Sequence, residues 1–228
     1  MSDRAASDER PGSGGESGTD GAPEPGESPR RDPEELPAEI RESVPDYDDE
    51  YFDRVSDRLM YSYDLDRDVV VDGERFELYA EMRVRNQKQF LHPALSYADH
   101  DMMEFVFARR VSTPSVADVE RLVEFAHGVA DDRVDGHEEH YGTDVTVVLV
   151  ADRVPDDVAD FVEGFHDRTL LKFGYYGHYE VNLVVVAPDR ESLAASESAD
   201  TAAAFRLWEA VDEPDEGLFS RFAKRFWR

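Results

Sequence analysis

The fold of this chain is decided by one stretch, which reads FELYAEMRVR at residues 76–85. Apolar and polar side chains alternate along it one by one, and this period of two is typical of a β-strand with one face toward a core. Three valines at residues 69–71 and an Asp72-Gly73 pair come just before it. The sequence therefore predicts a strand, a tight hairpin turn and a second, long strand.

The segments outside this hairpin show either helical spacing or apolar runs. Residues 145–151 and 179–187 are apolar almost throughout, which indicates strands covered on both faces. A helical segment from Pro155 joins them, and such a connection favours a parallel pair. Further patterns indicate a strand at 103–110 and helices at about 47–62, from Pro114 onward and at 199–211. We expect an α/β fold with a single mixed sheet of about five strands. The expected order is helix-strand-strand-strand-helix-strand-helix-strand-helix, with the helices packed on the sheet.

The charge balance of the chain is strongly acidic. The 228 residues include 53 Asp and Glu against 25 Lys and Arg, a formal net charge of −28, and only three of the basic residues are lysines. Self-repulsion at this charge opposes a compact state, whereas molar salt shortens the Debye length to about 3 Å and removes most of that cost. Hydrophobic residues still make up 40%, too many for a disordered acidic protein. We interpret the composition as adaptation to the cytoplasm of a salt-accumulating halophile.

Composition divides the chain into three parts. Residues 1–44 are rich in Gly, Ser, Pro, Asp and Glu without apolar periodicity, so we expect a disordered acidic tail. Residues 45–212 hold the α/β domain, and residues 213–228 hold a linker and a C-terminal helix. The N-terminal residues lack the apolar stretch of a secretory signal, and no apolar run approaches the ~20 residues of a membrane span. We therefore expect a cytoplasmic protein.

Motifs that would identify an enzyme are missing from the sequence. The chain contains no cysteine, which excludes disulfides and thiolate metal sites. It also contains no G-x-S-x-G, Walker or H-E-x-x-H motif. No cofactor is expected, and the acidic body disfavours nucleic acid as a partner.

The polar face of the long strand, with the segment after it, is the first candidate site. Its carboxylates and guanidiniums either pair across strands or line a site for a polar ligand. The candidate ligand-binding residues are Glu77, Tyr79, Glu81, Arg83, Arg85, Lys88 and His92. The element order is also similar to the restriction-endonuclease-like core, in which acidic residues and a lysine hold a magnesium ion. The Glu-x-Lys of that core is replaced here by Glu81-Met82-Arg83, which argues against a nuclease.

Two further segments combine residue types that bind ligands. His137 and His140, in a loop with Glu138 and Glu139, are weak candidates for a metal ion, and the sequence shows no obvious third ligand. Aromatic residues, glycines, a lysine and a histidine gather at residues 172–179. This segment is either an aromatic turn that closes the edge of the sheet or a binding surface.

The C-terminal segment at residues 218–228 is basic and aromatic and holds no acidic residue. At ~100° per residue, its apolar side chains gather within roughly 100° of a helix, with the cations opposite. Such a helix docks on its own domain or a second subunit, binds a protein partner, or lies on an anionic membrane surface. The candidate interaction residues are Leu218, Phe219, Arg221, Phe222, Lys224, Arg225, Phe226 and Trp227.

The stretch from Phe76 to Glu81, continued by Asn86-Gln87-Lys88-Gln89-Phe90-Leu91-His92-Pro93, resembles an uncharacterised domain of haloarchaeal proteins with distant bacterial relatives. The resemblance covers residues 47 to about 190. It implies a domain of unknown function and transfers no catalytic residue.

The sequence as a whole favours a binding or interaction domain without a catalytic site, because it shows no convergent nucleophile, base or ligand set. One alternative is a metal-dependent hydrolase or nuclease-like enzyme that uses residues 77–92. The other is a peripheral membrane protein that uses its C-terminal helix.

Overall fold

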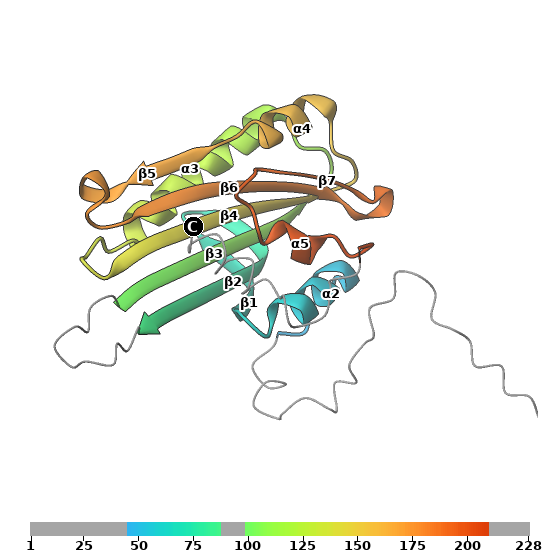
Figure 1. Cartoon of the computed structure of the whole chain (residues 1–228). Coiled ribbons are helices and arrows are strands. Elements are labelled where there is room, and N and C mark those ends of the chain that lie inside the picture. Colours follow the sequence, from blue (N-terminus) through green and yellow to red (C-terminus); the bar gives the residue numbers. More distant parts are fainter. Residues whose placement is uncertain (1–44, 88–98, 210–228) are drawn as a thin grey trace, which may run out of the picture.

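The computed structural model describes residues 45–87 and 99–209 of the chain. These residues form one open mixed sheet of seven strands with helices on both faces (Figure 1). In chain order the elements are α2 (Glu50–Leu59), β1 (Asp64–Val71), β2 (Glu74–Gln87), β3 (Asp99–Val111), α3 (Val116–Arg133), β4 (His140–Ala151), α4 (Asp156–Glu163), β5 (Asp167–Leu170), η2 (Leu171–Gly174), β6 (His178–Ala187), η3 (Pro188–Arg190), β7 (Ser192–Ala195) and α5 (Ala202–Phe205).

The strand order in the sheet is β1-β2-β3-β4-β6-β5, with β7 also paired to β6. The first three strands are antiparallel, whereas β3, β4 and β6 run parallel to one another. Both short strands, β5 and β7, pair antiparallel with β6. The prediction of a mixed α/β sheet with a parallel pair is confirmed. The sheet has more strands than the expected five because β5 and β7 hold four residues each, too few to show a period in the sequence.

The predicted tight hairpin between the first two strands is present. Val71 pairs with Glu74, so the turn consists of Asp72 and Gly73 alone. Both turn residues have positive φ, 50° and 81°, as a two-residue turn that fits the twist of the strands requires. The hairpin fixes the register of the long strand β2 on β1.

Capping side chains set where the main helices begin. The Asp49 carboxylate accepts from the backbone N–H of Tyr51 at the start of α2. Ser115 and Asp118 cap each other's backbone at the start of α3, and the hydrogen bonds from Ser115 lower the pKa of Asp118 to about 2.

The helix expected at residues 199–211 is much shorter than the sequence suggested. Among the described residues of this range, 199–209, only Ala202–Phe205 is α-helical, and the backbone leaves the helical region at Arg206. The guanidinium of Arg58 explains the early end, because it donates to the carbonyl oxygens of Ala203, Arg206 and Glu209. Carbonyls that would otherwise continue the helix are satisfied by this side chain from α2.

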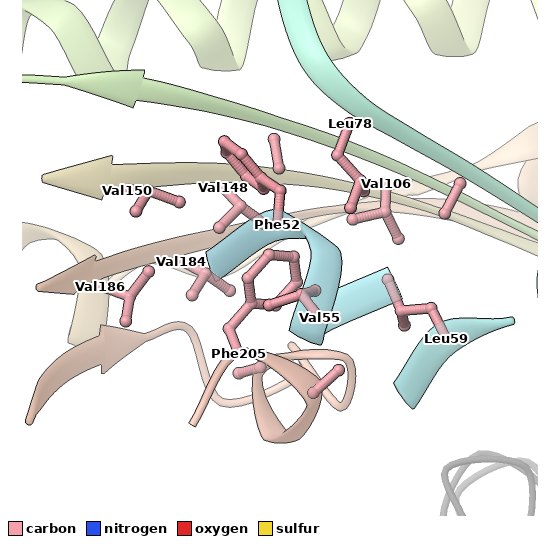
Figure 2. Packing of buried hydrophobic residues seen from close by; sticks show 14 of the residues in the cluster. Phe52, Val55, Leu59, Leu78, Val106, Val148, Val150, Val184, Val186 and Phe205 are labelled. Atoms are coloured by element: carbon pink, nitrogen blue, oxygen red, sulfur yellow. The ribbon is translucent and has the colours of Figure 1, made fainter. Parts of the chain in front are cut away.

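Each face of the sheet carries an apolar core. The α2 core packs α2 and α5 on one face (Figure 2), and the α3 core packs α3 and α4 on the other. Main members of the α2 core are Phe52, Val55, Leu59, Leu78, Val106, Val148, Val150, Val184, Val186 and Phe205. Main members of the α3 core are Phe76, Phe105, Phe107, Val119, Leu122, Val145, Val147, Leu149, Val181, Leu183 and Val185. Helices on both faces explain why β4 and β6 read as continuous apolar runs.

The alternation along β2 breaks once, which the sequence did not indicate. Phe76 packs in the α3 core, whereas Leu78, two residues later, packs in the α2 core. On the neighbouring strand, Asp68 lies between the partners of these two residues and has a φ of 54°. Beyond the break, Ala80 and Met82 stay on the α2 side, as the alternation predicts.

Within the described ranges, no helix is both long and apolar enough to cross a membrane.

Candidate ligand-binding site

The most unusual polar feature of the sheet is a row of three carboxylates, here called the carboxylate row. Glu104 of β3 pairs with Asp144 of β4, and Asp144 pairs with Glu180 of β6. Paired residues of neighbouring strands project to the same face, and the row lies on the α2 side because Glu104 stands between Met102 and Val106 of the α2 core. The exposed fractions are 3%, 2% and 3%. Buried carboxylates are costly unless they are paired, so such a row makes this region a candidate for a functional site.

Hydroxyl groups surround the first member of the row. Tyr63 donates to Glu104 Oε2 at 2.6 Å, Thr146 donates to Oε1 at 3.4 Å, and Thr201 donates to the same oxygen. Burial raises the pKa of Glu104, and the hydrogen bonds from Thr201 and Tyr63 oppose that rise. Burial, followed by the nearby Glu104 charge, raises the pKa of the Tyr63 hydroxyl well above its usual value. Glu104 is therefore held by neutral donors in an environment that favours its protonated form.

A guanidinium and an imidazole stand at the other end of the row. Arg168 Nη1 lies 3.5 Å and His178 Nε2 lies 3.6 Å from Glu180 Oε1. Arg168 Nη2 also lies 3.2 Å from His178 Nδ1. Because a guanidinium only donates, His178 Nδ1 accepts this hydrogen bond and the ring proton sits on Nε2, toward Glu180. The three side chains orient one another.

The short strand β5 directs Arg168 to this site because the preceding residue, Asp167, is held by a contact on the other face of the sheet. Asp167 Oδ2 lies 3.1 Å from His127 Nε2, and His127 Nδ1 lies 3.0 Å from the Tyr179 hydroxyl. These side-chain contacts connect β5 and β6 to α3. Alternate residues of a strand point to opposite faces, so holding Asp167 on the α3 side directs Arg168 to the α2 side.

An open cavity of about 320 Å³ lies beside these side chains, and we call it the entry cavity. Its wall joins the start of β4, the end of β5, the loop between β5 and β6, and the start of β6. The lining residues are Glu138, His140, Tyr141, Arg168, Leu170, Gly174, Tyr175, Gly177 and His178. Of these lining residues, Arg168 has a side chain that is 47% exposed, whereas the side chain of His178 is 6% exposed.

The last residue of β5 and the loop that follows it expose apolar side chains next to the cavity. Phe173 is 98% exposed, Tyr175 85% and Leu170 59%. Lys172 and Phe173 both adopt left-handed backbone conformations, with φ of 46° and 60°. Such conformations are uncommon in residues other than Gly, Asn and Asp, and they cluster at functional loops.

Gly177 allows this loop to pass close to β4. Its φ is +74°, and a Cβ at this position would lie 2.3 Å from the carbonyl oxygen of Tyr141 and 2.6 Å from that of His140. No other residue fits there without a shift of the backbone.

The predicted polar strand face is placed against α3 and is largely engaged with its own neighbours. The Tyr79 hydroxyl donates to Glu81 and accepts from Arg133, and Arg83 pairs with Glu81 at 2.5 Å. Burial acts to raise the pKa of Glu81, but the hydrogen bonds from Tyr79 and Arg83 outweigh it and the pKa is lowered. Glu77 accepts from a backbone N–H of β3. Glu81 pairs with Phe105 of the α3 core, so it lies on the face opposite to Glu104.

Of the other predicted residues on this face, Arg85 lies in β2, whereas Lys88 and His92 lie outside the described residues.

The two histidines considered for a metal ion are close together, with ring centroids 6.2 Å apart. Both ring nitrogens of His140 have protein partners, the Tyr176 carbonyl at 2.7 Å and the Thr143 hydroxyl at 2.9 Å. His137 accepts from the backbone N–H of Glu139. In the part of the chain that the structure describes, no group of three or more His, Asp or Glu side chains is arranged to hold a metal ion.

The candidate interaction residues of the C-terminal segment, 218–228, lie outside the described residues.

Sequence reasoning missed Arg168 and the carboxylate row, although a signal for the row exists. Asp144 and Thr146 in β4, and Glu180 and Asn182 in β6, are polar residues at every second position of otherwise apolar strands. Their alternation predicts one polar half-face on adjacent strands. The segment at residues 172–179, for which the sequence left open an aromatic turn or a binding surface, supplies part of the cavity lining.

A family model described as "Domain of unknown function (DUF8052)" matches residues 47–207, which include the whole sheet and the site. No curated protein and no solved structure matches the chain.

Proposed function

Since the chain belongs to the DUF8052 family, a domain of unknown function, we propose its function from the site: it binds a small molecule with a planar or aromatic body and an anionic group in the entry cavity. The observation that carries this proposal is the position of Arg168. Its guanidinium is half exposed at the cavity wall, and its contacts with the buried side chains of Glu180 and His178 orient it. A guanidinium has five N–H donors, so donors remain for a carboxylate or a phosphate.

The rest of the lining suits the body of such a ligand. Tyr141, Tyr175 and Leu170 offer aromatic and aliphatic surface, and Gly174, with no atom within 4 Å of its Cβ position, allows close approach of a ligand to the backbone. The exposed Phe173 extends the apolar surface beyond the cavity. A planar ligand would stack on the tyrosines while its anionic end meets Arg168.

Binding without a reaction is the activity we propose. The nine described lining residues include no serine, threonine or cysteine that a neighbouring base could activate. His178 is oriented toward Glu180 inside the fold, with its other nitrogen held by Arg168. The side chains of the site thus hold one another in place and serve recognition.

The acidic composition supports a further part of the proposal, a cytoplasm with molar salt. A net charge of −28 with only three lysines is well tolerated where the Debye length is about 3 Å. Under these conditions the acidic body does not repel an anionic ligand from the cavity. Local contacts with Arg168 then decide the affinity.

The test is a thermal-unfolding screen in molar KCl with aromatic carboxylates and nucleoside monophosphates as probes. A probe at 100 times its Kd stabilises the folded state by about 2.7 kcal/mol, which raises Tm by roughly 5–10 °C for a domain of this size. Arg168→Gln should abolish the shift. Arg75→Gln is the matched control, because Arg75 is also exposed and paired with a carboxylate, away from the cavity. The proposal fails if no probe shifts Tm, or if the shift is the same in both variants.

A further inference from the structure

The part of the α2-side face that carries the carboxylate row has no described helix over it. Figure 1 shows α2 and α5 together over the other end of this face, where they cover the carboxyl halves of β4 and β6. The amino ends of β3, β4 and β6, at the left of the view, carry no helix from the described ranges on this side. We call this region the acidic half-face.

The side chains of the acidic half-face are nevertheless buried. Besides the carboxylate row, Met82 and Met102 are 5% and 8% exposed. Tyr63 and Thr201 reach Glu104 from the side of α2 and α5, and Arg168 reaches Glu180 from the edge of the sheet. Full burial of the half-face needs a covering layer of chain. Such a layer meets apolar surface at the methionines and acidic side chains at Asp144 and Glu180, so a segment with both apolar and cationic side chains suits it.

The C-terminal segment 218–228 has this chemistry. It holds four cations, Arg221, Lys224, Arg225 and Arg228, and no acidic residue, in a chain whose net charge is −28. Its sequence predicts an amphipathic helix with an aromatic face. Guanidiniums pair well with buried carboxylates, because two parallel N–H donors satisfy both oxygens.

The position where the described chain ends brings this segment within reach. Glu209 lies beside α2, since its carbonyl oxygen accepts from Arg58 in the last turn of that helix. Residues 210–217 can span up to roughly 26–29 Å when extended. A helix over residues 218–228 would be about 16 Å long, and the stretch of β4 from residue 140 to 146 is about 20 Å long. The lengths therefore match.

We propose that residues 218–228 dock on the acidic half-face of their own domain. One flank of the segment places its cations toward Asp144 and Glu180, and the other flank places its aromatic side chains toward Met82 and Met102. The docked segment completes the α2-side layer of the fold. Docking here does not require a ligand in the entry cavity, so the two proposals can fail independently.

The lack of cysteine and the presence of only five methionines allow a direct test in the full chain. A nitroxide attached at Ser220→Cys would broaden methyl signals of labelled methionines with the inverse sixth power of distance. We expect Met82 and Met102 to lose most of their intensity, and Met103, which packs against the opposite core, to lose less. A nitroxide at Asp132→Cys, near the end of α3, is the matched control and should affect Met103 most.

Two further samples decide how the segment is held. Arg221→Glu, Lys224→Glu and Arg225→Glu together should restore the signals of Met82 and Met102, because they reverse the charge that faces the carboxylates. Unchanged broadening in this triple variant would overturn the pairing with the row. Broadening that arises only between a nitroxide-bearing chain and a separate methyl-labelled chain would assign the half-face to a second copy and overturn intramolecular docking.

No preferential broadening of Met82 and Met102 in any sample would also overturn the proposal. Flotation of the same chain with anionic vesicles would then assign the segment to a membrane surface.

Discussion

Removing one hydroxyl group, with the substitution Tyr63→Phe, tests whether Glu104 is a buried, partly charged group. Tyr63 is 6% exposed and donates to the Glu104 carboxylate at 2.6 Å. A hydrogen bond to a charged group contributes about 1.5–3 kcal/mol, and a neutral one about 0.5–1.5 kcal/mol. Tyr51→Phe is the matched control, because Tyr51 is 8% exposed in the same core and donates to the neutral Phe205 carbonyl at 2.7 Å. We expect Tyr63→Phe to cost about 1 kcal/mol more than the control at pH values where Glu104 is ionised.

The two penalties should also differ in their dependence on pH. The pKa of Glu104 is raised above its ordinary value of 4.5 by burial, so in the folded state Glu104 keeps its proton to a higher pH than in the unfolded state. Its contribution to stability is therefore fully present below pH 4.5 and is lost as pH rises through the raised pKa. Without the Tyr63 donor the ionised form is stabilised less, which raises the folded pKa further. The penalty of Tyr63→Phe thus grows with pH, whereas the penalty of Tyr51→Phe stays constant.

Urea unfolding in molar KCl, repeated from below pH 4.5 upward, measures the loss of unfolding free energy in both variants. Equal penalties for the two variants at all pH values would refute the assignment of Glu104 as a group that ionises inside the fold. A Tyr63→Phe penalty that falls with rising pH would refute the sign of the pKa shift.

Two other predictions concern the loop at the cavity and the charge of the chain. Gly177→Ala should destabilise the protein by several kcal/mol, because its Cβ would lie 2.3 Å from the Tyr141 carbonyl oxygen. Gly73→Ala, at a similar positive φ with no atom within 4 Å, should cost only about 1–2 kcal/mol; equal losses of Tm in the two variants would contradict the close approach. The free energy of unfolding should rise between about 0.1 and 1 M KCl, as the Debye length falls from about 10 to 3 Å. Stability that is flat or falling over this range would argue against adaptation to salt.

Much of the fold was predictable because it depends on local patterns. Alternation identified β2, the Asp72-Gly73 pair identified the hairpin, and the apolar runs identified β4 and β6 as strands covered on both faces. The short strands β5 and β7 were missed because four residues show no period. The helix at residues 199–211 was overestimated because Arg58, distant in sequence, takes the carbonyl oxygens that would extend it.

The candidate site was predictable only in part, and the reason lies in the register of the strands. The aromatic and glycine-rich segment before β6 could be recognised from its composition. Alternating polar residues in β4 and β6 indicate a polar half-face, but the sequence does not indicate that Glu104, Asp144 and Glu180 share one row, because their alignment depends on how three strands pair. The polar face of β2, which the sequence suggested as a ligand site, instead packs against α3, where its polar groups contact one another.

The sequence by itself therefore determined the class of fold, the main strands and helices, and the acidic composition, since these follow from periodicity and residue content along the chain. Only the tertiary structure decided which polar residues meet. Parallel pairing of β3, β4 and β6 aligns three carboxylates on one face, and the pairing of β5 with β6 brings Arg168 to the end of that row. Such contacts depend on strand register and on which face each side chain occupies, and neither is a property of any single segment.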